Sequence, residues 1–189
     1  MPDGKTHDKI TLWLIPLVLG GSFWTTRSER LTLLTAIAFG FSGLMFGPDL
    51  DIHSRQYQRW GWLRWLWLPY RKLLRHRSPW SHGFLIGTVV RLLYVGLWGM
   101  GLGLLILGGV WLWQRGQVSL LPPTPTGSGL LAWGRRYQGE LLASFIGLEL
   151  GAMSHSLCDW GGSWLKKQRG KRRSPSKATL RRQRSGRRR

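Results

Sequence analysis

The sequence predicts an all-α integral membrane protein: a helical bundle of about four apolar helices, a His/Asp site on its cytoplasmic face, and a disordered basic C-terminal tail. Three observations predict it: long apolar segments, histidines and aspartates at the ends of those segments, and 28 basic against 8 acidic residues among 189. We expect residues 1–165 to form a membrane-embedded metal-binding helical domain. Residues 166–189, which contain no acid, are expected to form the tail. The single Cys158 excludes an internal disulfide framework.

Four apolar segments predict the helices. Leu92 to Trp113 carries no charge and exceeds the roughly 20 residues that cross a hydrocarbon core. Ile10 to Trp24 and Leu31 to Phe46 are shorter, and they form either two short spans or one re-entrant hairpin. The fourth segment runs from Leu141 to Leu157. A proline-rich stretch, residues 121–129, is expected to be the connector between the third and fourth segments.

Two features inside these segments concern helix packing. Gly99 and Gly103 form a G-x-x-x-G pair, which indicates either a close helix contact or an ordinary glycine-rich surface facing lipid. Arg91 and Glu149 are charges within apolar surroundings. Because such charges need partners, we expect a salt bridge between them.

The topology places all five histidines on one side of the membrane. If all four segments cross, the N-terminus, residues 48–83 and everything after His155 share a face. Most basic residues lie on that face, so the positive-inside rule predicts that it is the cytoplasmic face of a bacterial inner membrane. Asp3 and Asp8 offset Lys5 and Lys9, so the positive start of a signal peptide is missing, and we expect His7 to be retained.

The metal-ligand motifs are short and polar. In Asp49-x-Asp51-x-His53, Pro48 favours the end of a helix, and alternate side chains of an extended segment share one side; the alternative is an acidic turn. His155 and Asp159 are four residues apart and share a helix face, although such a pair is often merely solvated.

His76 and His82 flank Ser78-Pro79-Trp80-Ser81, and Pro79 prevents one continuous helix from holding both. Taken singly, each histidine fits an interfacial hydrogen-bonding role. Convergence with the other motifs favours metal binding instead. The candidate ligands are His7, Asp49, Asp51, His53, His76, His82, His155 and Asp159. This set exceeds the four ligands of one tetrahedral zinc, so we expect one or two divalent transition-metal ions, zinc being favoured.

These motifs resemble those of two groups of bacterial membrane proteins. The segments Gly4-Lys5-Thr6-His7-Asp8, Pro48 to His53, His76 to Gly83 and His155-x-x-x-Asp159 resemble a bacterial family of uncharacterised metal-binding membrane proteins familiar from cyanobacteria, over Met1 to Trp160. More distantly, their order is similar to that of LexA-regulated membrane-bound proteins predicted to be metal-dependent hydrolases. Ser78-Pro79-Trp80-Ser81 departs from the glycine and threonine of that second pattern. The resemblance therefore implies metal binding more firmly than hydrolysis.

Three functions fit these observations. The first is a metal-dependent phosphoester hydrolase at the membrane, in which a carboxylate such as Asp49 or Asp51 bridges two ions about 4 Å apart and Arg77 and Arg75 hold the phosphate. The second is a non-catalytic metal-binding or metal-handling protein. The third is a basic membrane scaffold that contacts nucleic acid.

Membrane lipid is the expected partner. Tyr57 to Leu74 interleaves Trp60, Trp62, Trp65 and Trp67 with basic residues, a composition typical of a segment in the headgroup layer, where it anchors the protein or delivers lipid to the histidines. Such interleaving also suits single-stranded nucleic acid. The basic tail is expected to favour anionic lipid or nucleic acid.

Overall fold

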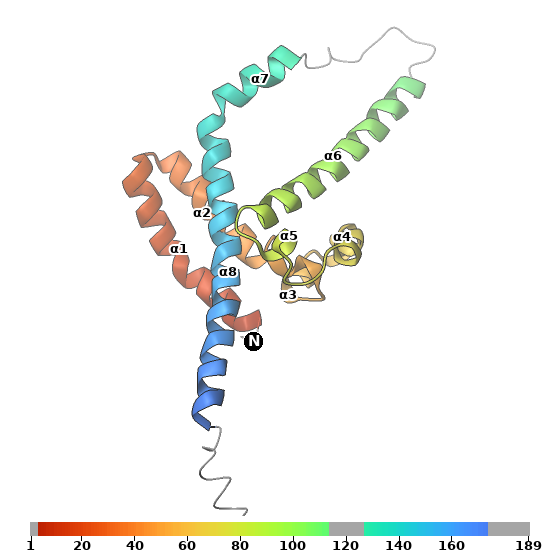
Figure 1. The fold of residues 1–189 in the computed structure, drawn as a ribbon. Coiled ribbons are helices and arrows are strands. Elements are labelled where there is room, and N and C mark those ends of the chain that lie inside the picture. Colours follow the sequence, from red (N-terminus) through yellow and green to blue (C-terminus); the bar gives the residue numbers. More distant parts are fainter. Residues whose placement is uncertain (1–3, 114–126, 174–189) are drawn as a thin grey trace, which may run out of the picture.

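The computed structural model describes residues 4–113 and 127–173, and within these ranges it is helical, without strands (Figure 1). Most of the proline-rich connector and the end of the basic tail lie outside the described residues. The all-α prediction is confirmed for the described chain. The elements are α1 (Gly4–Thr26), α2 (Glu29–Leu44), η1 (Pro48–Asp51), α3 (Arg55–Gln58), η2 (Gly61–Trp67), α4 (Leu68–Leu73), α5 (Pro79–His82), α6 (Ile86–Trp113), α7 (Gly127–Arg136) and α8 (Gln138–Arg173).

The first two helices form an antiparallel hairpin that packs against α8 (Figure 1). Arg27 makes the turn with a left-handed φ of 51°. Ser28 then caps α2, because its hydroxyl accepts a hydrogen bond from the backbone N–H of Leu31 at 3.4 Å. The hairpin brings the start of α1 and the end of α2 to the same level of α8.

Two glycines of α8 allow α2 to approach closely. A Cβ added at Gly147 would lie 2.3 Å from the carbonyl oxygen of Thr35, and one added at Gly151 would lie 2.5 Å from that of Phe39. The other G-x-x-x-G pair, Gly99 and Gly103, has no described atom within 4 Å of such a Cβ. Within the described chain, the alternative of a close helix contact at Gly99 and Gly103 is therefore wrong, and the pair lies on an open helix surface.

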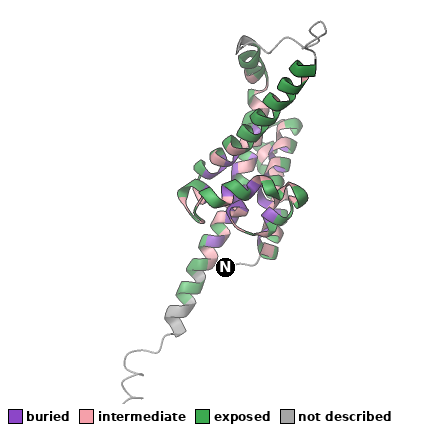
Figure 2. Ribbon diagram, turned by 90° about the vertical axis from the view of Figure 1, so that its right-hand side faces the viewer, coloured by how far each residue is buried: buried purple, intermediate pink, exposed green. Residues whose placement is uncertain are grey.

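Helix α6 diverges from the bundle, and its side chains are mostly exposed along its length (Figures 1 and 2). By length and composition, three segments of the described chain could cross a membrane: Glu29–Asp51, Ile86–Trp113 and Gln138–Gln168. Helix α1, the first predicted apolar segment, is not among them. The described chain thus offers three such segments rather than the expected four.

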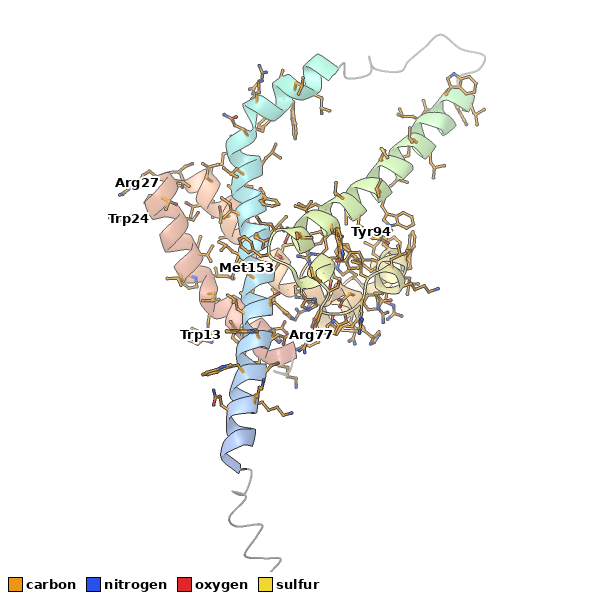
Figure 3. All side chains as sticks on the ribbon, in the orientation of Figure 1. Trp13, Trp24, Arg27, Arg77, Tyr94 and Met153 are labelled. Atoms are coloured by element: carbon orange, nitrogen blue, oxygen red, sulfur yellow. The ribbon has the colours of Figure 1, made fainter. Side chains whose placement is uncertain are left out.

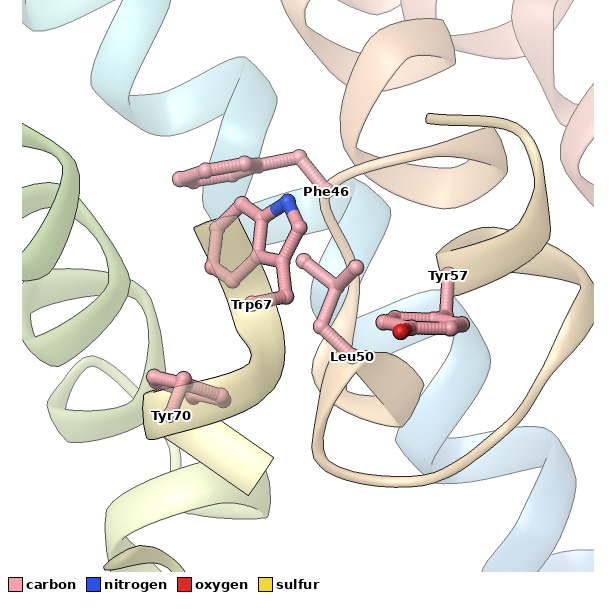
Figure 4. Packing of buried hydrophobic residues seen from close by; sticks show 5 residues of the cluster. All are labelled: Phe46, Leu50, Tyr57, Trp67 and Tyr70. Atoms are coloured by element: carbon pink, nitrogen blue, oxygen red, sulfur yellow. The ribbon is translucent and has the colours of Figure 1, made fainter. Parts of the chain in front are cut away.

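An aromatic cluster holds the segment that follows α2. Phe46, Leu50, Tyr57, Trp67 and Tyr70 are buried together (Figure 4). Burial raises the pKa of Tyr70 to about 12. Trp67 is 1% exposed, so its indole belongs to this core and not to the predicted membrane boundary, whereas Trp62 is 79% exposed. Because Leu50 is fully buried in the cluster, the flanking Asp49 and Asp51 have fixed positions.

The C-terminal half is more helical than the sequence pattern indicates. Helix α7 precedes α8 as a separate element that no apolar segment predicted. Helix α8 extends beyond residue 165 to Arg173, so the first part of the predicted disordered tail continues the helix.

Candidate metal centre

Four parts of the chain bring the predicted ligands together. The start of α1 carries His7, η1 carries two aspartates, the segment around α5 carries His76 and His82, and the middle of α8 carries His155 and Asp159. The α1–α2 hairpin and the short loop into α6 place these elements at one level of α8. Seven of the eight predicted ligands lie in this connected set: His7, Asp49, Asp51, His76, His82, His155 and Asp159.

The first group consists of His7, His155 and Asp159. Each offers one ligand atom, and these atoms all lie within 4.8 Å of one another; all three residues are buried. His7 Nε2 is 3.2 Å from Asp159 Oδ1, and the rings of His7 and His155 stack with centroids 3.9 Å apart. The pair on α8 shares a face, as the four-residue spacing predicts.

The second group consists of Asp49, His76 and His82, which meet the same 4.8 Å criterion and are half-buried. Pro79 starts the short α5 and His82 ends it. The chain therefore turns between the two histidines, and their ring centroids come within 4.9 Å.

Asp49 joins the two groups. Its Oδ2 atom lies 3.1 Å from Nε2 of His155, and its Oδ1 atom lies 3.6 Å from Nε2 of His82. One carboxylate thus faces a histidine of each group. If each group held an ion, this carboxylate could contact both.

Asp51 faces the other side of the second group's imidazoles. Its side chain is fully buried, with Oδ1 at 2.9 Å from His76 Nδ1 and Oδ2 at 3.7 Å from His82 Nδ1. A carboxylate on Nδ1 orients an imidazole so that its Nε2 can bind metal. The position of Asp51 therefore favours orientation of His76, while its second oxygen lies beyond hydrogen-bond distance of His82. Its direct ligation stays a prediction.

His53 is not brought into either group. It is exposed, its ring lies 5.4 Å from that of Tyr57, and its Nδ1 is 3.4 Å from the side-chain amide of Gln58. The extended backbone of Ile52, directly after η1, separates it from the two aspartates.

Arg77, predicted to hold phosphate, is exposed and has a left-handed φ of 62°. It lines the same cavity as His82 and Asp159.

Two site residues escaped the sequence patterns. Gln56 is buried; its amide donates to the carbonyl of Gly43 at 2.9 Å and lies 3.5 Å from His155 Nδ1. Ser81 Oγ lies 2.9 Å from His82 Nδ1. Neither type is a usual metal ligand, so no ligand pattern includes them. The one available signal for Ser81 is its position next to His82.

The predicted salt bridge between Arg91 and Glu149 is wrong. Arg91 donates instead to the carbonyl of Ser81 at 3.0 Å and to the hydroxyl of Thr88 at 2.9 Å. Glu149 accepts from the backbone N–H of Leu85 at 3.0 Å. Backbone groups of α5 and of the loop that follows it therefore bind both charges, and the segment that carries His82 is held from two sides.

The donor set fits a metal ion. Several buried nitrogen and oxygen atoms have no hydrogen-bond partner in the described chain, although buried polar atoms normally have one. They include His7 Nδ1, Asp49 Oδ1, Asp51 Oδ2, His82 Nε2, His155 Nε2 and Asp159 Oδ2. Imidazole and carboxylate donors without other partners suit a divalent transition metal.

Comparison with known proteins agrees with this chemistry. The family model described as "Uncharacterized metal-binding protein (DUF2227)" matches residues 2–169. The chain belongs to this metal-binding family. An uncharacterized protein of Aquifex aeolicus (strain VF5) is 41% identical over 64 residues, which cover 31% of this chain and 45% of that relative, so the match spans less than half of the relative's length. No solved structure matches.

Proposed function

We propose that this protein is a metal-dependent phosphoester hydrolase at the cytoplasmic face of a bacterial membrane. The observation that carries the proposal is the position of Asp49 between two ligand groups, one with His155 and one with His82. Paired ligand groups that share a carboxylate are typical of centres that hydrolyse phosphoesters.

The side chains of the site have three different roles: metal binding, orientation of ligands and phosphate binding. His7, His155 and Asp159 would hold one ion, and His76 and His82 would hold a second, with Asp49 within reach of both groups. When bound there, one or two divalent ions, zinc being the one favoured by the donors, withdraw charge from the phosphoryl group and make water more acidic. Asp51 orients the imidazole of His76, and the hydroxyl of Ser81 orients that of His82. Arg77 donates to phosphate oxygens from the cavity wall.

Membrane location is supported by the exposed apolar surface. Helix α6 exposes large hydrophobic side chains along most of its length, an area that a soluble monomer rarely leaves in water. The basic residues of segment 48–83 lie at the level of the site, and by the positive-inside rule this supports a site at the cytoplasmic face.

The test is hydrolysis of two soluble esters, p-nitrophenyl phosphate and bis(p-nitrophenyl) phosphate, by protein purified in mild detergent. We expect activity that chelation abolishes and zinc restores. Arg77→Ala should lower kcat without metal loss, and the exposed Arg64→Ala should serve as the matched control. Bound metal without hydrolysis of either ester would instead indicate a metal-handling protein. Absence of bound metal would favour the third function, a basic membrane scaffold that contacts nucleic acid.

A further inference from the structure

A cavity of about 430 Å³ lies between the α5–α6 junction and one face of α8. Its wall includes His82 of one ligand group and Asp159 of the other. Most of the remaining wall is apolar, and Phe84, Met153, Leu157 and Trp160 supply much of it. Figure 3 shows two of the lining residues, Arg77 on the loop before α5 and Met153 on α8.

We propose that this cavity binds a membrane phospholipid, with the phosphate at the ligand groups and Arg77 and an acyl chain along Phe84, Leu157 and Trp160. The proposal rests on the proposed function and names its substrate class. A soluble phosphoester would contact only the polar end of this cavity. An amphiphile would also contact the apolar wall.

Exposure of the apolar wall supports a lipid occupant. Phe84 is 59% exposed, Leu157 57% and Trp160 71%. These side chains line the cavity next to the candidate ligands His82 and Asp159. Phe84 is followed by the exposed Leu85 and Ile86, so the wall continues into the first residue of α6, and the large exposed side chains of α6 resume at Val89.

The charges of the wall suit a phosphate. Arg77 supplies an exposed cation beside His82. Glu149 also lines the cavity, but its Oε1 accepts the N–H of Leu85, and Arg91 lines the same cavity as an opposing charge. Arg77 is thus the exposed cation available to an anion, with Glu149 and Asp159 balanced by the buried Arg91 and by the ligand histidines, while the rest of the wall is mainly apolar and also includes Ser156 and Ser163.

The reaction balances without a further reactant. The oxygen of a water molecule forms a bond to phosphorus, the P–O bond to the lipid alcohol breaks, and a proton from the water passes to the leaving oxygen. The products are an alcohol and a phosphate group, and nothing is oxidised or reduced.

Binding distinguishes lipid from free phosphoester independently of turnover. Metal-loaded protein in amphipol is titrated calorimetrically with non-hydrolysable phosphonate analogues of dihexanoyl phosphatidic acid and of glycerol 3-phosphate. We expect the lipid to bind at least about tenfold more tightly, because only it contacts the apolar wall. The double variant Leu157→Gln, Trp160→Gln should remove about tenfold of the lipid affinity and leave the affinity for the glycerol 3-phosphate analogue unchanged. Trp164→Gln, one turn further along α8 and outside the cavity lining, is the matched control.

Equal affinity for the two ligands, or equal loss of both in the double variant with metal content intact, overturns the proposal. If the protein hydrolyses the soluble nitrophenyl esters but binds the lipid and glycerol 3-phosphate analogues equally, the proposed function stands and the lipid proposal is wrong. Selective lipid binding without hydrolysis of any ester would retain the lipid site and remove the proposed function. Failure of both ligands to bind overturns the lipid proposal outright.

Discussion

One carboxylate oxygen of Asp49 lies 3.1 Å from Nε2 of His155, although the first residue follows α2 and the second lies in the middle of α8. The other oxygen faces His82. The two ligand groups are therefore parts of one centre. Loss of Asp49 should affect both groups, whereas loss of His7 or His76 should affect mainly one.

Arg91 is expected to act as a positioning residue for His82. Arg91→Met removes the donors to Ser81 and Thr88, so the loop that carries His82 loses an anchor. We expect metal affinity to fall about 10- to 100-fold, as for other residues that orient ligands. Metal competition with a chromogenic chelator measures this. Arg64→Met, at an exposed position, is the control, and unchanged affinity in Arg91→Met would refute the positioning role.

The glycines of α8 give a prediction about stability. Gly151→Ala places a methyl group 2.5 Å from the carbonyl oxygen of Phe39 and 2.7 Å from Cβ of Ser42, so the contact between α2 and α8 must open. Overpacking of this kind costs about 1–3 kcal/mol. The midpoint of thermal unfolding in detergent should fall accordingly. Gly99→Ala meets no described atom within 4 Å and should unfold at or above the wild-type temperature; a larger loss there than in Gly151→Ala would contradict the packing described.

The membrane topology can be tested with single cysteines in a Cys158→Ser background. Lys5→Cys, Gln58→Cys and Lys167→Cys introduce exposed thiols near the level of the site or beyond it, and Arg27→Cys introduces one at the far turn of the α1–α2 hairpin. With an impermeant maleimide on spheroplasts, Arg27→Cys should react, and the other three should react only after permeabilisation. Labelling of Gln58→Cys and Lys167→Cys from opposite sides would contradict a single cytoplasmic face.

The sequence predicted the convergence of the ligands because each motif lies at the end of an apolar segment. The spacing of His155 and Asp159 also predicted their shared face. The sequence did not indicate which residues of Asp49-x-Asp51-x-His53 are ligands. The short η1 helix and burial of Leu50 turn Asp49 toward both groups and Asp51 behind the histidines, while the extended Ile52 leaves His53 outside.

The backbone partners of Arg91 and Glu149 could not be predicted from the sequence either. Arg91 and Glu149 looked like mutual partners because both charges lie in apolar segments, yet each binds a loop that no charge pattern reveals. The two G-x-x-x-G pairs have the same spacing. Only the tertiary fold shows that Gly147 and Gly151 contact another helix and that Gly99 and Gly103 do not.

The most direct test of the shared centre is metal content per chain by elemental analysis of wild type, Asp49→Ala and His53→Ala, purified side by side. Asp49→Ala should lose most of its metal, because both ligand groups lose a donor. His53→Ala should keep the wild-type content, because His53 belongs to neither group. Full metal content in Asp49→Ala, or equal loss in His53→Ala, would contradict a centre organised around Asp49.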